Sequence, residues 1–287
     1  MPELPEVETV VKGLRSAGFV GSTIASASVR WPRTIAAPSP RAFARKIRET
    51  RVLSVTRRGK FIVVGLNTGL TLLIHLRMTG RLLFSTSDEP ADAHDHVVLR
   101  LRDGRELRYR DTRKFGRWRL TRNPHSILGD LGPEPLSPAF TARRFAARLG
   151  RHPGMLKPLL LNQRFLAGLG NIYVDEALWE ARLHPTRSCA TLSEPEMQRL
   201  YLAIRRVLRR GIRSQGTSLG NASTNFRGVD GSIGRNRDNL RVFRRVGKPC
   251  PRCGSVIRRL TIAQRSTHIC PECQQERCAC AVGSVRP

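Results

Sequence analysis

The first eighteen residues, MPELPEVETVVKGLRSAG (residues 1–18), decide how the chain starts to fold. Four apolar residues in this stretch fall at helical spacing: Val7, Val10, Val11 and Leu14. Pro5 suits the first turn of a helix, and Gly18 suits its end. We therefore predict a helix that begins almost at the N-terminus and anchors it through one apolar face.

Beyond this helix, from about Ser22 to Leu120, the pattern changes to short strands. The candidates are Ile24–Trp31, Val52–Arg57, Phe61–Leu66 and Leu70–Leu76. A hairpin with Asp103-Gly104 in its turn follows. In it, four apolar residues alternate with arginines: Leu99, Leu101, Leu107 and Tyr109 with Arg100, Arg102, Arg108 and Arg110. The pattern predicts a β-sandwich with one solvated, arginine-rich face.

The second half of the chain is helical in its spacing and follows a linker, GPEPLSP, at residues 132–138. Ser193 and Glu196 form a capping-box pattern. An apolar stripe comes after them: Met197, Leu200, Tyr201, Ile204, Val207, Leu208 and Ile212. From Gly211 to about Arg245 the chain is rich in Gly, Asn, Ser and Arg, which predicts a long mobile loop.

The charge of the chain is strongly positive, with 51 Lys and Arg against 22 Asp and Glu, a formal net charge of +29. Such an excess attracts polyanions, and nucleic acid is the first candidate because neutralised phosphates release counterions. The alternative is that the charge serves solubility or reflects a high-GC genome, whose codons favour arginine. A membrane role is disfavoured, since no apolar run reaches the roughly 18 residues that a spanning helix needs.

The N-terminus has no basic region followed by an apolar one, so it does not have the pattern of a signal peptide. We expect a protein of the reducing cytosol. Its seven cysteines are an odd number, and four have metal spacing, which argues against a disulfide framework.

The four cysteines are two Cys-x2-Cys pairs separated by sixteen residues: Cys250, Cys253, Cys270 and Cys273. Each pair supplies two thiolates from one tight turn, which suits tetrahedral zinc. Four thiolates close the coordination sphere, so one structural Zn²⁺ per chain is predicted, with an iron–sulfur or redox site as the alternative. The residues between the pairs suit a hairpin with Arg265 near its tip. Cys189, Cys278 and Cys280 are predicted to be ordinary thiols.

Six segments in order resemble those of bacterial formamidopyrimidine-DNA glycosylase, of the family that also contains endonuclease VIII. They are residues 2–8 (PELPEVE), 58–61 (RGKF), 75–80 (HLRMTG), 111–116 (DTRKFG), 167–173 (AGLGNIY) continuing to His184-Pro185, and 264–270 (QRSTHIC). They run through nearly the whole chain. Leu4 stands where endonuclease VIII usually has Gly.

The resemblance implies an α+β multidomain fold. It comprises an N-terminal helix plus β-sandwich, a helical domain with a helix–two-turn–helix motif, and a C-terminal β-hairpin zinc finger. We expect domains at residues 1–134, 135–240 (including a lesion-capping loop) and 241–275, with a tail at 276–287.

The implied activity is that of a bifunctional DNA glycosylase and AP lyase in base excision repair. It would remove 8-oxoguanine and formamidopyrimidines through an imine on Pro2, exposed by removal of Met1, and then cut the strand by β,δ-elimination. By resemblance, Glu3 is the general acid/base, Lys60 contacts phosphate and aids catalysis, and Arg265 completes the catalytic set as a phosphate clamp.

The implied partner is damaged double-stranded DNA, bound by a monomer associated with the bacterial nucleoid. Because the target base must be extruded, the gap it leaves has to be filled. Met78, Arg113 and Phe115 match the void-filling residues of the family. Three further residues are implied DNA contacts: His75, Lys157 and Asn171.

The sequence departs from the common family pattern in the segment at residues 216–234, which is longer and lacks the usual acidic residue, so base specificity is open. One alternative is a pyrimidine-lesion enzyme of the endonuclease VIII type, which Leu4 and the Arg113/Phe115 loop disfavour. The other is a non-catalytic damaged-DNA-binding protein of the same fold, against which Pro2, Glu3 and Lys60 argue.

Overall fold

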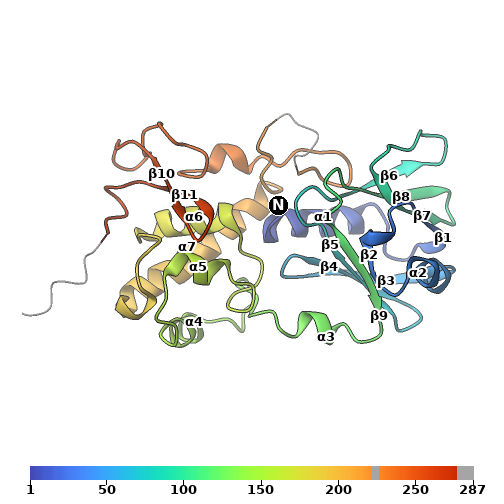
Figure 1. Ribbon diagram of the computed structural model, residues 1–287, viewed down its shortest axis with the longest axis horizontal. Helices are drawn as coiled ribbons and strands as arrows, with labels where there is room; N and C mark the ends of the chain where they lie inside the picture. Colours follow the sequence, from blue (N-terminus) through green and yellow to red (C-terminus); the bar gives the residue numbers. More distant parts are fainter. Residues whose placement is uncertain (221–225, 277–287) are drawn as a thin grey trace, which may run out of the picture. The chain divides into compact units, whose positions relative to one another are not determined.

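The computed structural model describes residues 1–220 and 226–276, which form two compact units (Figure 1). The first unit holds residues 1–134 and 208–239, and the second holds residues 135–207 and 240 onward. Residues 221–225 of the predicted capping loop, and the predicted tail from 277, lie outside the described residues.

The predicted N-terminal helix is present as α1 (Leu4–Ser16). A capping box starts it: the Glu3 side chain accepts the Glu6 backbone N–H, and the Glu6 carboxylate accepts the Glu3 backbone N–H. The chain leaves the helix at Gly18, whose φ of +71° suits glycine. One helix face is buried, through Leu4, Val7, Val10, Val11 and Leu14.

The first unit contains nine strands joined in one ladder, in the order β2-β9-β5-β4-β3-β1-β7-β8-β6. The strands are β1 (Thr23–Val29), β2 (Ile35–Ala37), β3 (Thr50–Arg58), β4 (Phe61–Leu66), β5 (Thr71–His75), β6 (Arg81–Thr86), β7 (Asp95–Leu101), β8 (Arg105–Arg110) and β9 (Arg117–Thr121). The short helices α2 (Pro40–Ile47) and α3 (His125–Leu128) also belong to this unit.

The ladder is two half-sheets, because β1 and β3 pair through only two residue pairs, at Thr23 and Ile24. Tyr109 of β8 and Trp118 of β9 come from different halves, yet their ring centroids lie 5.4 Å apart. The halves therefore face each other, with the apolar core between them, and the predicted β-sandwich is confirmed.

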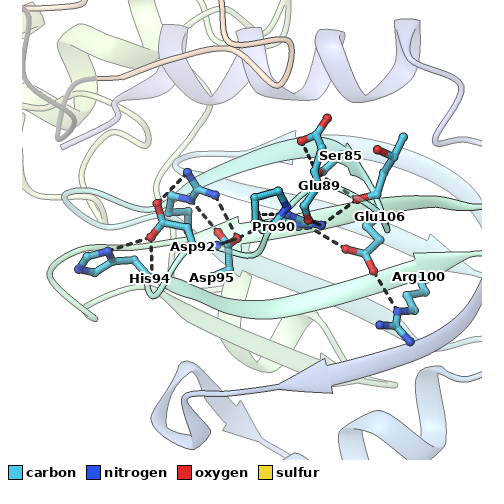
Figure 2. Close-up of polar contacts among 11 residues, drawn as sticks. Ser85, Glu89, Pro90, Asp92, His94, Asp95, Arg100 and Glu106 are labelled. Carbon is cyan, nitrogen blue, oxygen red and sulfur yellow. Dashed lines mark hydrogen bonds and ion pairs between the residues drawn. The ribbon is translucent and has the colours of Figure 1, made fainter.

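The prediction that these arginines face solvent is wrong for Arg108 and only partly right for Arg110. Arg108 is 2% exposed, and its Nε donates to Glu106 Oε2 at 2.8 Å. Arg110 Nε donates to the buried Asp95 at 2.7 Å. The end of β6 and the segment after it supply further acceptors to Arg108, the carbonyls of Thr86, Glu89 and Pro90. Figure 2 shows Glu89, Pro90 and Asp92 of this segment close to the strands. Arg108 and Arg110 therefore bond to protein acceptors, whereas Arg100 and Arg102 remain exposed, as predicted.

The second unit is helical, with α4 (Ala142–Leu149), α5 (Leu156–Leu161), α6 (Asn171–Ala181) and most of α7 (Glu194–Arg213). The predicted capping box precedes α7, since the Ser193 N–H donates to Glu196 Oε2 at 2.9 Å. Gly211 lies inside α7, so the predicted loop begins only after Arg213. The hairpin of β10 (Arg258–Ile262) and β11 (Arg265–Ile269) completes this unit.

The segment after α7 belongs to the first unit up to residue 239, and backbone bridges connect its own parts. Backbone bridges join Thr217 to Arg235 and Arg227 to Ile233. Val229 is 4% exposed, and a Cβ added at Gly13 of α1 would lie 2.6 Å from it. The predicted mobile loop is therefore tied to the sandwich in its described part.

Candidate active site and DNA-contacting loops

The first two residues of the predicted catalytic set lie at the buried start of α1. Pro2 is buried, and Glu3 is 2% exposed. The Glu3 N–H donates to Glu6 Oε2 at 2.8 Å, so the capping box fixes the backbone next to Pro2. If Met1 is removed, Pro2 has an amine next to this buried carboxyl group, which is then a suitable partner for proton transfer.

Lys60 lies in the turn between β3 and β4, the two strands on which α1 packs. It is 6% exposed. Glu134 shapes this turn: its Oε1 accepts the Gly59 N–H at 2.5 Å, and its Oε2 accepts from Arg57 Nη1 at 2.8 Å. Arg57 in turn contacts Glu8 of α1 at 3.0 Å. Sequence reasoning did not single out Glu134, because it lies more than 70 residues away from this turn.

His75 ends β5, paired with Phe61 of β4, and its ring stands edge-on to the Phe61 ring with centroids 4.8 Å apart. Burial, helped by the nearby charges of Arg77 and Lys60, lowers the pKa of His75 to about 3. Its Nδ1 accepts a hydrogen bond from the Arg77 backbone N–H, with 3.0 Å between the two nitrogen atoms. The ring is therefore neutral, with its proton on Nε2, and can donate one hydrogen bond to a phosphate oxygen.

The three predicted void-filling residues come together at the surface of the first unit. Met78 is 41% exposed and Phe115 is 46% exposed. Arg113 connects them: its Nη1 lies 3.2 Å from Met78 Sδ, and its Cζ lies 4.9 Å from the centre of the Phe115 ring. The arrangement suits insertion into a base stack better than a place in a core.

In the second unit, Asn171 and Arg265 are linked through the tip of the hairpin. Asn171 is the first residue of α6, and its Nδ2 donates to the Ser266 carbonyl at 2.8 Å. Arg265 precedes Ser266 and is exposed. The turn before it, Ala263-Gln264, has both φ angles positive, which is the two-residue turn that closes a tight hairpin.

Lys157, an implied DNA contact, is fully buried in α5. Its Nζ donates to Asp175 Oδ1 at 2.5 Å and to the Ser266 carbonyl at 3.0 Å. The other carboxylate oxygen of Asp175 accepts the His268 backbone N–H at 2.9 Å. Lys157 and Asp175 therefore hold the hairpin against α5 and α6. Asp175 could not be singled out from the sequence, because its partners lie 18 and 93 residues away along the chain.

The four predicted zinc ligands converge, with their Sγ atoms all within 4.8 Å of one another. The Cys250–Cys273 distance is 3.9 Å, and the Cys253–Cys270 distance is 3.4 Å. Four bonds of about 2.3 Å to tetrahedral zinc place sulfur atoms about 3.8 Å apart, so the cluster fits the ion. Trp179 Nε1 also donates to Cys250 Sγ at 3.4 Å, which supports the thiolate from outside the cluster.

Cys189, the remaining cysteine among the described residues, is not part of this cluster. Cys189 is buried, and burial raises the pKa of its thiol to about 11. A thiol of that pKa is unreactive at neutral pH. Cys278 and Cys280 lie outside the described residues.

Comparison with known families accounts for most of the chain. The Formamidopyrimidine-DNA glycosylase N-terminal domain matches residues 1–118. The Formamidopyrimidine-DNA glycosylase H2TH domain matches residues 131–223, and the zinc finger found in FPG and IleRS matches residues 247–275. The chain belongs to the formamidopyrimidine-DNA glycosylase family.

Relatives and solved structures in this family align with the chain over nearly their full length. The Formamidopyrimidine-DNA glycosylases of Protochlamydia amoebophila and Herpetosiphon aurantiacus are 46% and 48% identical over 276 residues, covering 96% of this chain and all of each relative. A Lactococcus lactis Fpg in complex with abasic site-containing DNA is 35% identical with a TM-score of 0.88, covering 96% of this chain and all of that one. A mutant of the same enzyme, in complex with Fapy-dG-containing DNA, has the same identity, coverage and TM-score.

Membership of the formamidopyrimidine-DNA glycosylase family confirms three predictions: the family itself, the α+β fold with its zinc finger, and one structural zinc. In the described part of the chain, no helix is long and apolar enough to cross a membrane. The roles of the individual site residues stay predictions.

Proposed function

We propose that the chain is a bifunctional DNA glycosylase and AP lyase of base excision repair that removes oxidised purines from duplex DNA. The observation that carries this proposal is the start of the chain, where Pro2 precedes a buried Glu3 on a capped helix. A secondary amine at a chain terminus is a nucleophile and can also form a cationic imine, which a primary alcohol or thiol cannot do.

In the proposed mechanism, removal of Met1 exposes the amine of Pro2. The Pro2 nitrogen attacks C1′ of the flipped nucleotide, and the C1′–N bond breaks with its electron pair leaving on the base, which takes up a proton. Glu3 takes the proton that the Pro2 nitrogen gives up and delivers it to the ring oxygen as the sugar opens, which leaves an iminium between Pro2 and C1′. Loss of a proton from C2′ then expels the 3′ phosphate, and a second elimination expels the 5′ phosphate.

The other site residues are proposed to hold and bend the DNA. Lys60, His75, Asn171 and Arg265 would bind backbone phosphates, which fixes the register of the strand. Arg113 would fill the gap left by the flipped base together with two partners, Met78 and Phe115. Lys157 would support the hairpin that carries Arg265, through the Ser266 carbonyl.

We further propose that the enzyme acts as a monomer on nucleoid DNA in the bacterial cytosol, since every predicted site residue comes from one chain. The proposed domains are residues 1–134, 135–240 and 241–275, with a tail at 276–287. A single molar mass by light scattering, unchanged on dilution, supports the monomer.

The lesion class is tested by incision of duplexes that carry 8-oxoguanine, a formamidopyrimidine or thymine glycol. The proposal predicts faster single-turnover excision of the two purine lesions. A preference for thymine glycol would favour the endonuclease VIII type, and binding without incision of any duplex would favour a non-catalytic protein.

A further inference from the structure

Asp111 is a buried carboxylate next to the void-filling residues, and the proposed mechanism does not use it. It follows the last residue of β8 and is 1% exposed. Its Oδ2 accepts the Gly116 N–H at 2.8 Å and the Tyr109 hydroxyl at 3.1 Å. Its Oδ1 accepts the Arg113 N–H at 3.2 Å and also the Thr79 hydroxyl. One carboxylate therefore receives four hydrogen bonds.

Three of these donors come from two separate loops, and the fourth, Tyr109, lies in β8. Thr79 follows Met78 in the loop between β5 and β6, whereas Arg113 and Gly116 enclose Phe115 in the loop between β8 and β9. The Thr79 hydroxyl oxygen also lies 3.2 Å from the Arg113 backbone nitrogen. The loops that carry Met78, Arg113 and Phe115 thus share one buried support.

Tyr109 reaches Asp111 through a gap that two glycines leave open. A Cβ added at Gly116 would lie 1.5 Å from the Tyr109 hydroxyl oxygen, and one added at Gly80 would lie 2.3 Å from it. Each loop supplies one of these glycines. Burial, together with the charge of Asp111, raises the pKa of Tyr109 far above its ordinary value, so its hydroxyl stays a donor.

We propose that Asp111 is a positioning residue that holds the two loops as one unit, so that Met78, Arg113 and Phe115 enter the base stack together. A carboxylate suits this task because it offers only acceptors, and all four groups around it are donors. This inference rests on the proposed function, since it gives the loops a role in flipping.

The test compares Asp111→Asn with Asp88→Asn, which removes the same charge from an exposed position in the same unit. Asparagine has an acceptor and a donor where the carboxylate has two acceptors, so at least one loop contact is lost. We expect single-turnover excision of 8-oxoguanine from a duplex to fall about 10- to 100-fold, as expected for lost hydrogen bonds to a charged group. We also expect weaker discrimination between cytosine and adenine opposite the lesion.

The second substrate is a single-stranded oligonucleotide with a preformed abasic site, which has no stacked base to flip. Asp111→Asn should cut it at the wild-type rate. An equal loss on both substrates would overturn the inference, because Asp111 would then support the whole fold. Wild-type excision and wild-type opposite-base choice in the variant would also overturn it.

Two further measurements keep the test decisive. Thr79→Val removes one donor at a partly exposed position and tests the inference if Asp111→Asn does not fold; it should lower duplex excision and spare the single strand. Failure of the wild-type protein to cut either substrate contradicts the proposed function itself, so the two failures are distinguishable.

Discussion

Replacing Lys157 with methionine tests how the tip of the zinc hairpin is held. Lys157 and Asp175 are both fully buried, with 2.5 Å between Nζ and Oδ1. Methionine keeps the length of the side chain but leaves the carboxylate without its cation and removes one donor from the Ser266 carbonyl. Removing one partner of a buried ion pair costs about 3–5 kcal/mol. We expect the free energy of unfolding to fall by that amount, or roughly two to four powers of ten in the equilibrium constant.

The assay is urea unfolding, followed through tryptophan fluorescence, with Lys248→Met as the control because Lys248 is exposed in the same unit. The control should unfold at the wild-type midpoint. Adding Asp175→Asn to Lys157→Met should recover part of the loss, because it removes the unpaired charge. A Lys157→Met protein with wild-type stability and weak DNA binding would refute the reasoning, since Lys157 would then contact DNA directly.

Three further predictions each rest on one local feature. Cys273→Ser should lose zinc and unfold the hairpin, seen as lost metal and weaker DNA binding, and a variant with full metal content would contradict the site. The pKa of His75 is about 3 in the folded protein and near 6.5 in an unfolded chain, so its contribution to stability is complete above pH 6.5 and is lost as the pH falls toward 3. Through this group the wild-type free energy of unfolding should fall by as much as about 2–3 kcal/mol between pH 7 and 4.5. In urea titrations, His75→Gln should lack that part of the fall. The Glu6 carboxylate accepts the backbone N–H groups of Glu3 and Thr217, both at 2.8 Å. Glu6→Gln loses one of these two acceptors and should lower the free energy of unfolding by about 1–3 kcal/mol in the same titrations; an unchanged midpoint would contradict that role.

Features that depend on neighbours in the sequence could be predicted. The spacing of Val7, Val10 and Leu14 predicted α1, and Phe61–Leu66 was predicted with the bounds that β4 has. The zinc cluster followed from ligand type and spacing. Helix α2 was missed, although it carries a local signal: Ser39 precedes Pro40, and its side chain accepts the Ala42 N–H as an N-cap.

Features that depend on distant residues could not be predicted. Strand alternation places Arg108 on a polar face, but only the folded segment between β6 and β7 shows that this face is covered by acceptors. Lys157 is another case, because its partner Ser266 is 109 residues away. Asp111 appeared in a recognised motif, but its support of two loops depends on Thr79 and Tyr109 meeting in space.

The central claim is that Pro2 forms the covalent link to DNA, and borohydride reduction during turnover tests it most directly. Reduction of the imine leaves a stable amine bond, so peptide mapping of the crosslink should place the sugar on the N-terminal peptide at Pro2. Retention of Met1 should abolish the crosslink, and Glu3→Gln should slow base release by roughly 10²–10⁴-fold with DNA binding nearly intact. A crosslink that maps to Lys60 would contradict the account. So would the absence of any crosslink while the enzyme still cuts the lesion duplex.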